Sequence, residues 1–241
     1  MARAPVQALA LAGGAYLAAL LAADHFATRG EQLILGVVTW VVLMTALSRV
    51  PFAIRVQTIG VVAFATVGEV TGSLVWGVYR YRLHNLPLFI PPAHGIVFLT
   101  GLALAASLRR HPRELVAAAA TTAAVLGLLG LTVLPRRDVA GAIGVPLLLV
   151  FLWRSRNRRV YAAVFLVVAC LELYGTALGT WRWQRTLPGL GIPDGNPPSG
   201  VASGYVWFDV MALLVAPMIY GPLRSLSGRN HHSYTASEGA Q

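Results

Sequence analysis

Apolar runs long enough to cross a bilayer recur along this chain, and they constrain its fold more than any other feature. A backbone in lipid must satisfy its hydrogen bonds within itself, which favours helices for runs of this length. The sequence therefore predicts an all-α integral membrane protein. About eight transmembrane helices are expected, at residues 6–23, 33–48, 58–78, 89–108, 115–134, 139–153, 160–180 and 203–221.

The charged residues support a membrane location and predict how the chain is oriented in the membrane. All 19 basic residues are Arg, and the formal charge of +10 is interpreted as loop arginines and not as a nucleic-acid surface. More of them fall on the side of the termini, which predicts both termini in the cytoplasm of a bacterial-type plasma membrane. The polar residues 225–241 are expected to be a disordered tail. The single cysteine, Cys170, excludes an internal disulfide.

Two stretches, starting at Glu69 and Glu172, carry the same landmarks in the same order. After the Glu come a Gly three residues on, a Ser or Thr, another Gly, an aromatic-Arg-aromatic triplet, a Leu-Pro pair, and two prolines followed by a Gly. This order indicates an internal duplication. A four-helix unit repeated in parallel gives halves of about 1–110 and 111–224, which together form a single membrane domain over 1–224.

The two repeated glutamates are the leading candidates for chemistry. An ionisable residue inside a span costs several kcal/mol unless it is paired, so its presence there favours a function. Helical spacing places Glu69, Gly72, Ser73 and Trp76 on one face. The alternative is that the glutamates only hold helices together. Asp209, in the last expected span, is the third catalytic candidate.

Other residues near the repeated motifs are candidates for substrate binding. Each candidate also has an interpretation without a role in binding. The aromatic residues could form an interfacial belt, Arg182 could be a snorkelling side chain, and His94 could be a helix cap. As a cavity wall, the aromatic faces can stabilise a carbocation. The candidates are Trp76, Tyr79, Tyr81, His94, Trp181, Arg182, Trp183, Asn196 and Tyr205.

Several familiar motifs are absent from the sequence. It has no Asp-rich pair for a magnesium-bound diphosphate, no His cluster with metal-ligand spacing, no phosphate- or dinucleotide-binding glycine loop, and no Gly-x-Ser-x-Gly elbow. The expected chemistry therefore uses carboxylates and aromatic groups, with no metal and no cofactor.

The motif E-x-x-G followed by G-x-Y-x-Y and a proline-bearing loop, from Glu69, resembles the membrane carotenoid-biosynthesis family that includes bisanhydrobacterioruberin hydratase. The W-x-W and Leu-Pro elements after Glu172 are similar to those of the small membrane lycopene cyclases. The resemblance implies a helical membrane enzyme that protonates an isoprenoid double bond, as a cyclase or a hydratase. Its partners would be a hydrophobic isoprenoid-like molecule and membrane lipid.

The residues permit such a mechanism. A glutamic acid in a dry pocket can protonate an alkene, and a second carboxylate can remove a proton or activate water. Which glutamate is the acid stays open at this level. Two other classes also remain: a proton-coupled carrier of a lipid or small molecule, and a structural subunit of a membrane complex.

Overall fold

The computed structural model describes residues 3–201, 204, 210–212 and 214–215, and these residues are mostly helical. The helices are α1 (Arg3–Phe26), α2 (Arg29–Ser48), α3 (Phe52–Glu69), α4 (Ile90–Ser107), α5 (Pro112–Thr132), α6 (Val139–Arg154) and α7 (Arg158–Leu178). A π-helix, η1 (Val70–Trp76), continues α3. Two short strands, β1 (Tyr79–Tyr81) and β2 (Trp181–Trp183), follow η1 and α7.

Six helical segments of the described chain are long and apolar enough to cross a membrane, counting α3 with η1 as one. The other helix, α6, has 16 residues and lies where the sequence predicts a span at 139–153. The helices appear where the apolar runs predict them, usually with a few more residues at the start. In α2 the extension has a clear cause, because Thr28 and Glu31 form a capping box.

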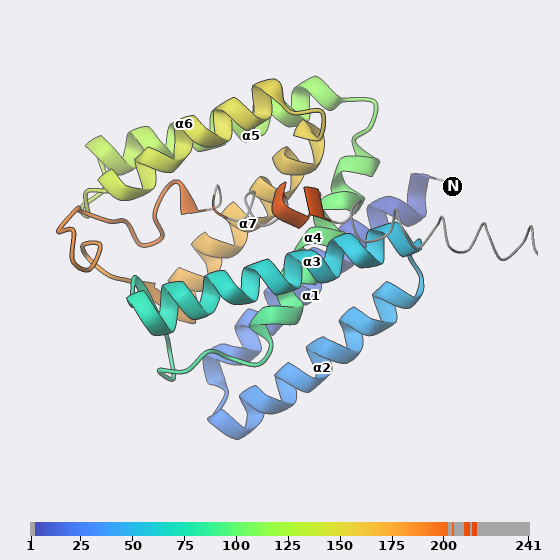
Figure 1. Ribbon diagram of the computed structural model, residues 1–241, viewed down its shortest axis with the longest axis horizontal. Coiled ribbons are helices and arrows are strands. Elements are labelled where there is room, and N and C mark those ends of the chain that lie inside the picture. The colour runs from blue at the N-terminus through green and yellow to red at the C-terminus, as the bar shows by residue number, and fades with distance from the viewer. Residues whose placement is uncertain (1–2, 202–203, 205–209, 213, 216–241) are drawn as a thin grey trace, which may run out of the picture.

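Two helices, α4 and α7, form the centre of the bundle. Along their apolar windows 56% and 50% of the residues are buried, against 17–28% for the other candidate spans. α4 packs against α1, α2, α3 and α7, and α7 packs against α1, α4, α5 and α6. Figure 1 shows α5 and α6 together on one side of α7 and the first helices on the other. The outer helices expose Leu, Ile and Val side chains, as a lipid-facing surface would.

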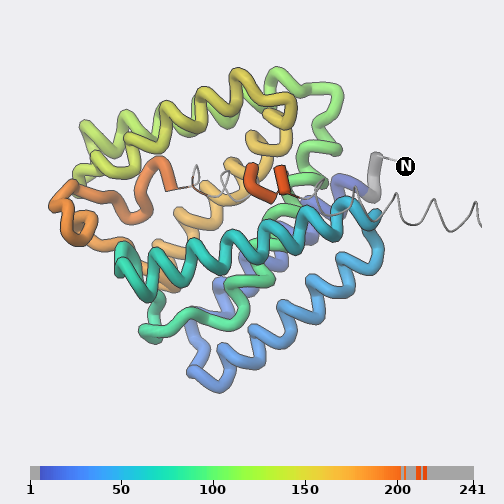
Figure 2. The backbone as a smooth tube through the Cα atoms, viewed as in Figure 1, coloured from blue at the N-terminus to red at the C-terminus, as the bar shows by residue number. Residues whose placement is uncertain are grey.

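An antiparallel ribbon joins the two repeated stretches. β1 pairs with β2 in a symmetric register, with Tyr79 opposite Trp183, Arg80 opposite Arg182, and Tyr81 opposite Trp181. The two segments are far apart in the sequence, and the tube in Figure 2 shows how the chain returns to bring them together. The predicted spans end before both triplets, at residues 78 and 180, and no strand was expected there.

The eighth expected helix, 203–221, lies mostly outside the described residues, and the tail, 225–241, lies wholly outside them. The all-α class is confirmed apart from the small ribbon. The pairing of two complete four-helix halves stays a prediction.

Candidate functional site

The first repeated motif forms a closed local unit around Glu69. After Glu69 the chain reverses at Gly77, whose φ of 75° lies in the left-handed region that favours glycine. The reversal directs Tyr79 and Tyr81 back towards the helix end. Their hydroxyls donate hydrogen bonds to Glu69 Oε2 at 2.6 Å and 2.5 Å. Burial, followed by the charge of Glu69, raises the pKa of Tyr79, so its phenol remains a proton-bearing donor.

The second motif repeats this unit with indoles in place of phenols. Gly179 also has a φ of 75° and turns the chain into β2. The Trp181 Nε1–H donates to Glu172 Oε2 at 2.9 Å, and Trp183 Nε1 lies 3.4 Å from the same oxygen. Each glutamate is therefore bound by the aromatic residues of its own motif.

The small residues of the motif make this geometry possible. A Cβ added at Gly72 would lie 2.9 Å from the Tyr79 ring, and one at Gly175 would lie 2.3 Å from the Trp181 ring. In each motif, the aromatic ring whose polar group binds the carboxylate therefore packs against the glycine that lies one turn after the Glu.

Because of this close approach, we expect Gly175→Ala to lower the free energy of unfolding. The added methyl group must displace the Trp181 indole, and such overpacking costs about 1–3 kcal/mol. For a chain of this size we expect a melting temperature about 3–10 °C lower in detergent. The matched control is Gly14→Ala, because a Cβ there meets nothing within 4 Å. Equal melting temperatures for the two variants would contradict the role of Gly175.

A one-residue difference between the copies explains the π-helix. Gly77 follows Glu69 by eight residues, whereas Gly179 follows Glu172 by seven. The extra residue is taken up in η1, while α7 remains an α-helix to Leu178. Because a π-helix has more residues per turn, Trp76 does not return to the face of Glu69 as α-helical spacing predicted. Trp76 is 46% exposed, and its Nε1–H donates to Pro188 O at 3.0 Å.

His94 lies next to Glu69 and completes a proton-holding pair. His94 Nδ1 is 2.9 Å from the carbonyl oxygen of Ile90, so this nitrogen must carry a hydrogen. His94 Nε2 faces Glu69 Oε1 at 3.4 Å. Close approach of these atoms is favourable when one proton resides on either the imidazole or the carboxyl. The pair is therefore suited to hold one transferable proton, which supports more than a capping role for His94.

Both glutamates line one central cavity of about 180 Å³. They are 5% and 3% exposed, as expected for interior and not lipid-facing residues. The four ribbon aromatics form much of the wall, and their rings contact one another, with centroids 4.5 Å apart for Tyr79 and Trp183. The full lining comprises Gly68, Glu69, Tyr79, Tyr81, Ile90, Glu172, Trp181, Trp183, Val201 and Gly204.

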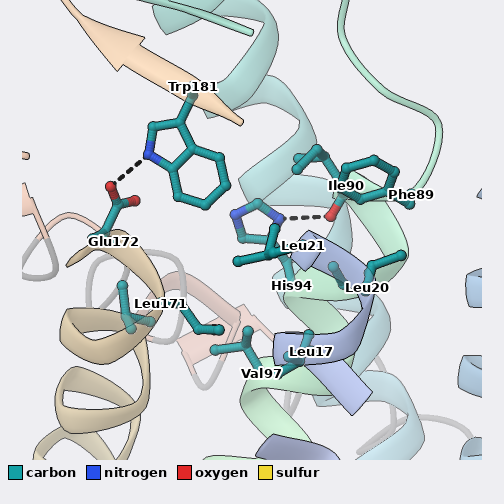
Figure 3. A pocket seen from close by; sticks show the side chains of 12 residues that line it. Leu17, Leu20, Leu21, Phe89, Ile90, His94, Val97, Leu171, Glu172 and Trp181 are labelled. Atoms are coloured by element: carbon teal, nitrogen blue, oxygen red, sulfur yellow. Dashed lines mark hydrogen bonds between the residues drawn. The ribbon is translucent and has the colours of Figure 1, made fainter. Parts of the chain in front are cut away.

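A smaller apolar cavity, of about 50 Å³, adjoins this site and shares Ile90, Glu172 and Trp181 with it. Figure 3 shows its polar groups, His94 and the hydrogen-bonded pair of Glu172 and Trp181, above a floor of aliphatic side chains. The floor comes from α1, α4 and α7 and includes Leu17, Val97 and Leu171. The carboxylates therefore face surroundings that are mainly hydrocarbon and aromatic.

The remaining sequence candidates are divided between several places. Tyr79, Tyr81 and Trp181 are buried and bound to carboxylates, so they do not form an interfacial belt. Arg182 is exposed at the middle of β2. Asn196 Oδ1 accepts a hydrogen bond from Trp183 N at 2.8 Å, outside the central cavity. Tyr205 and Asp209 lie outside the described residues.

A polar cluster that was not predicted from the sequence holds the first motif loop in place. Asp24 is fully buried and accepts a hydrogen bond from Gln32 Nε2 at 2.7 Å. Arg82 donates to the carbonyl oxygens of Asp24 and Ala27, and its Nε lies 4.0 Å from the Asp24 carboxylate. Asn85 Nδ2 also donates to Gln32 Oε1. The signal that was overlooked is an acidic residue at the end of an apolar run.

A second missed cluster fixes the other motif loop. Asp138 caps α6 and accepts backbone hydrogen bonds from Gly141, Gly195 and Ser199. Arg136 Nε donates to Asp194 O at 2.6 Å. The described residues include no group of three or more His, Cys, Asp or Glu side chains placed to hold a metal ion.

Asp194 has an unusual titration in this loop. Burial and then the charge of Asp138 raise its pKa from 3.8 to about 7. Because the pKa of Asp194 is higher in the folded state than in the unfolded state, folding favours the protonated form of its carboxyl group. The contribution of Asp194 to the free energy of unfolding is therefore most favourable below about pH 4, and this contribution is lost as the pH rises towards 7.

Asp194→Asn is expected to remove this loss. The amide stays neutral, so the variant should melt about 5–10 °C higher than the wild type at pH 8 and close to it at pH 4. Thermal melting in detergent across this range measures the difference. Glu114→Gln, at an exposed acid of α5, is the control. Parallel pH profiles for wild type and Asp194→Asn would contradict a raised pKa for Asp194.

Comparison with family models, curated proteins and solved structures gave no significant match, so the site is interpreted from its own geometry.

Proposed function

We propose that the protein is an integral membrane enzyme that protonates a carbon–carbon double bond of an isoprenoid-like molecule, as a cyclase or a hydratase. The observation that carries this proposal is the central cavity, where two buried glutamates meet among four aromatic rings. Carboxyl groups supply and accept protons, and the π faces stabilise a cation between these steps. The resemblance of the motifs to carotenoid-biosynthesis proteins points to the same class of substrate.

The two glutamates are assigned different roles because different side chains surround them. The pair of Glu69 and His94 is the proton donor: its one transferable proton rests on the imidazole while Glu69 is the carboxylate that accepts from the two phenols, and it passes through Glu69 to the alkene. Glu172 binds indole N–H groups, which donate but cannot accept, and this environment suits a carboxylate base.

The proposed steps balance in atoms and charge. The proton of Glu69 moves to one alkene carbon and leaves a tertiary cation on the other. If an internal alkene attacks the cation, a ring forms and Glu172 removes a proton from a neighbouring carbon. If water attacks, its proton goes to Glu172 and the product is a tertiary alcohol. Asp209 remains a third candidate carboxylate.

A proton-coupled carrier of lipid or small molecules is the second candidate, because a buried His–Glu pair also suits a coupling site. Expression in a carotenoid- or terpene-producing host, with mass spectrometry of extracted lipids, separates the two. An enzyme gives a product of new mass, whereas a carrier returns its cargo unchanged. Lipid profiles identical with and without the protein would contradict the enzyme proposal.

The proposed architecture places two parallel four-helix halves around the ribbon, with the 203–221 segment as the eighth span. The symmetric register about Arg80 and Arg182 supports a twofold relation between the motifs. The proposed location is a bacterial plasma membrane with both termini in the cytoplasm, based on the arginine distribution.

This orientation predicts that the 181–204 loop faces outward. In a Cys170→Ala background, a cysteine introduced at the exposed Thr186 should react with an impermeant thiol reagent in intact cells. The Cys170→Ala protein itself is the control for background labelling. Reaction only after lysis would reverse the orientation.

A further inference from the structure

The outer face of the ribbon carries two arginines directly opposite each other, the arginine pair. Arg80 pairs with Arg182 at the centre of the register of β1 and β2, and both residues are exposed. Because side chains alternate along a strand, the arginine pair lies on the face of the ribbon opposite the four aromatic residues. The Cβ atoms of directly opposed residues lie about 4.5–5.5 Å apart, and like charges at such positions are destabilising. An anion bound between the two guanidinium groups would remove this repulsion.

Further positive charge lies next to the arginine pair. The pKa of Arg136 is lowered first by burial and then, among the nearby charges, by those of Arg185 and Arg182. The charges of Asp194 and Asp138 raise it in part. Arg185 is exposed like Arg182, whereas both of these acids are buried. The exposed charge on this side of the ribbon is therefore positive.

The acids in the loops around the ribbon are buried or bound by their own neighbours. Glu31 accepts hydrogen bonds in the capping box of α2. The other acids of these loops are buried, namely Asp24, Asp138 and Asp194. Within the described part of the chain, no hydrogen bond or ion pair involves the side chain of Arg80 or Arg182. The arginine pair is thus free to bind an anion from outside the chain.

The ribbon lies at the level where lipid headgroups begin. Both strands start three residues after the end of a candidate span, Phe52–Trp76 for β1 and Arg158–Leu178 for β2. The last residues of η1, Leu74 to Trp76, are exposed and mainly apolar, so acyl chains can pack directly beside the start of β1. Headgroup phosphates are the most concentrated anions at this depth of a bilayer.

We propose that the arginine pair binds the headgroup phosphate of an anionic phospholipid, with phosphatidylglycerol as the test lipid. The planar guanidinium group forms paired hydrogen bonds with phosphate oxygens, and two such groups on one face can share one phosphate. A zwitterionic lipid offers the same phosphate together with an ammonium group, which the pair repels. The aromatic face of the same ribbon binds Glu69 and Glu172, so the lipid would stabilise a wall of the central cavity. This inference does not depend on the proposed chemistry.

The first test compares melting temperatures in nanodiscs of phosphatidylcholine alone and of phosphatidylcholine mixed with phosphatidylglycerol. Wild type should melt about 4–8 °C higher in the mixed lipid. The double variant Arg80→Gln/Arg182→Gln should lose most of this difference. Arg109→Gln/Arg110→Gln is the matched control, because it removes the same charge from two exposed arginines between α4 and α5 and should keep the difference.

The single variant Arg182→Gln separates a built anion site from two independent surface arginines. In phosphatidylcholine alone it should melt about 1–4 °C higher than the wild type, because the repulsion with Arg80 is gone. In the mixed lipid it should melt lower than the wild type, because the phosphate has lost one guanidinium group. A variant that is no more stable than the wild type in phosphatidylcholine would contradict the repulsion on which the site depends.

Direct binding and the source of the phosphate are tested on the same proteins. Native mass spectrometry should show that the wild type retains phosphatidylglycerol, and Arg80→Gln/Arg182→Gln should weaken this binding about tenfold or more. Inorganic phosphate added to wild type in phosphatidylcholine should not reproduce the rise in melting temperature, because it lacks the acyl chains that hold a lipid at the ribbon. Equal retention of phosphatidylglycerol by wild type and double variant, or a full rise with inorganic phosphate, would overturn the inference.

Discussion

Glu69→Gln and Glu172→Gln are each expected to lower product formation by about 10²–10⁴-fold per unit of membrane-inserted protein. Gln keeps the shape and the hydrogen-bonding capacity of the side chain but removes the transferable proton. If the glutamates only held helices together, Gln would serve almost as well, at a cost of about 1 kcal/mol or less.

The measurement is product formation in the host, normalised to the amount of inserted protein. Glu114→Gln, at an acid on the surface, is the matched control and should keep full activity. Asp209→Asn should resemble the Glu variants if that residue is a base. Full activity in both Glu variants would rule out acid–base chemistry and leave the carrier and structural hypotheses.

The double variant Tyr79→Phe/Tyr81→Phe should lose about 10 °C or more of melting temperature. Both phenols donate to Glu69 Oε2, and a hydrogen bond to a charged group contributes about 1.5–3 kcal/mol. Phe keeps the rings that pack in the ribbon, so the loss reports the missing donors. Tyr174→Phe, at an exposed position of α7, should melt like the wild type.

A double-mutant cycle links this effect to the carboxylate. In a Glu69→Gln background the two Tyr→Phe changes should cost clearly less, because an amide oxygen is a weaker acceptor than a carboxylate. The same loss in both backgrounds would show that the phenols do not act through Glu69.

The sequence predicted the positions of the described helices because long apolar runs leave the backbone few alternatives in lipid. It also identified Glu69 and Glu172 as interior residues, since an unpaired charge in a span is costly. The repeated landmarks marked the site before any structural role was known for them. Gly175, for example, is a shared glycine in the sequence, and the structure shows that the Trp181 ring packs against it.

Other features depend on contacts that no local pattern specifies. The pairing of β1 with β2 joins segments about a hundred residues apart, although the alternation in Tyr79–Tyr81 was a weak strand signal. The displaced Trp76 follows from a π-helix that α-helical spacing could not anticipate. The proximity of Ser199 to Asp138 likewise arises only when the 193–199 loop folds onto the start of α6.

The most direct test of the central claim is deuterium incorporation during turnover in D₂O. Membranes that contain the protein and its lipid substrate are incubated in D₂O, and the products are analysed by mass spectrometry after back-exchange in H₂O. Protonation of an alkene by Glu69 should leave one non-exchangeable deuterium on carbon in each product molecule. This label should be lost in Glu69→Gln membranes. A product without carbon-bound deuterium, or substrate recovered unchanged in mass, would contradict acid-catalysed protonation at this site.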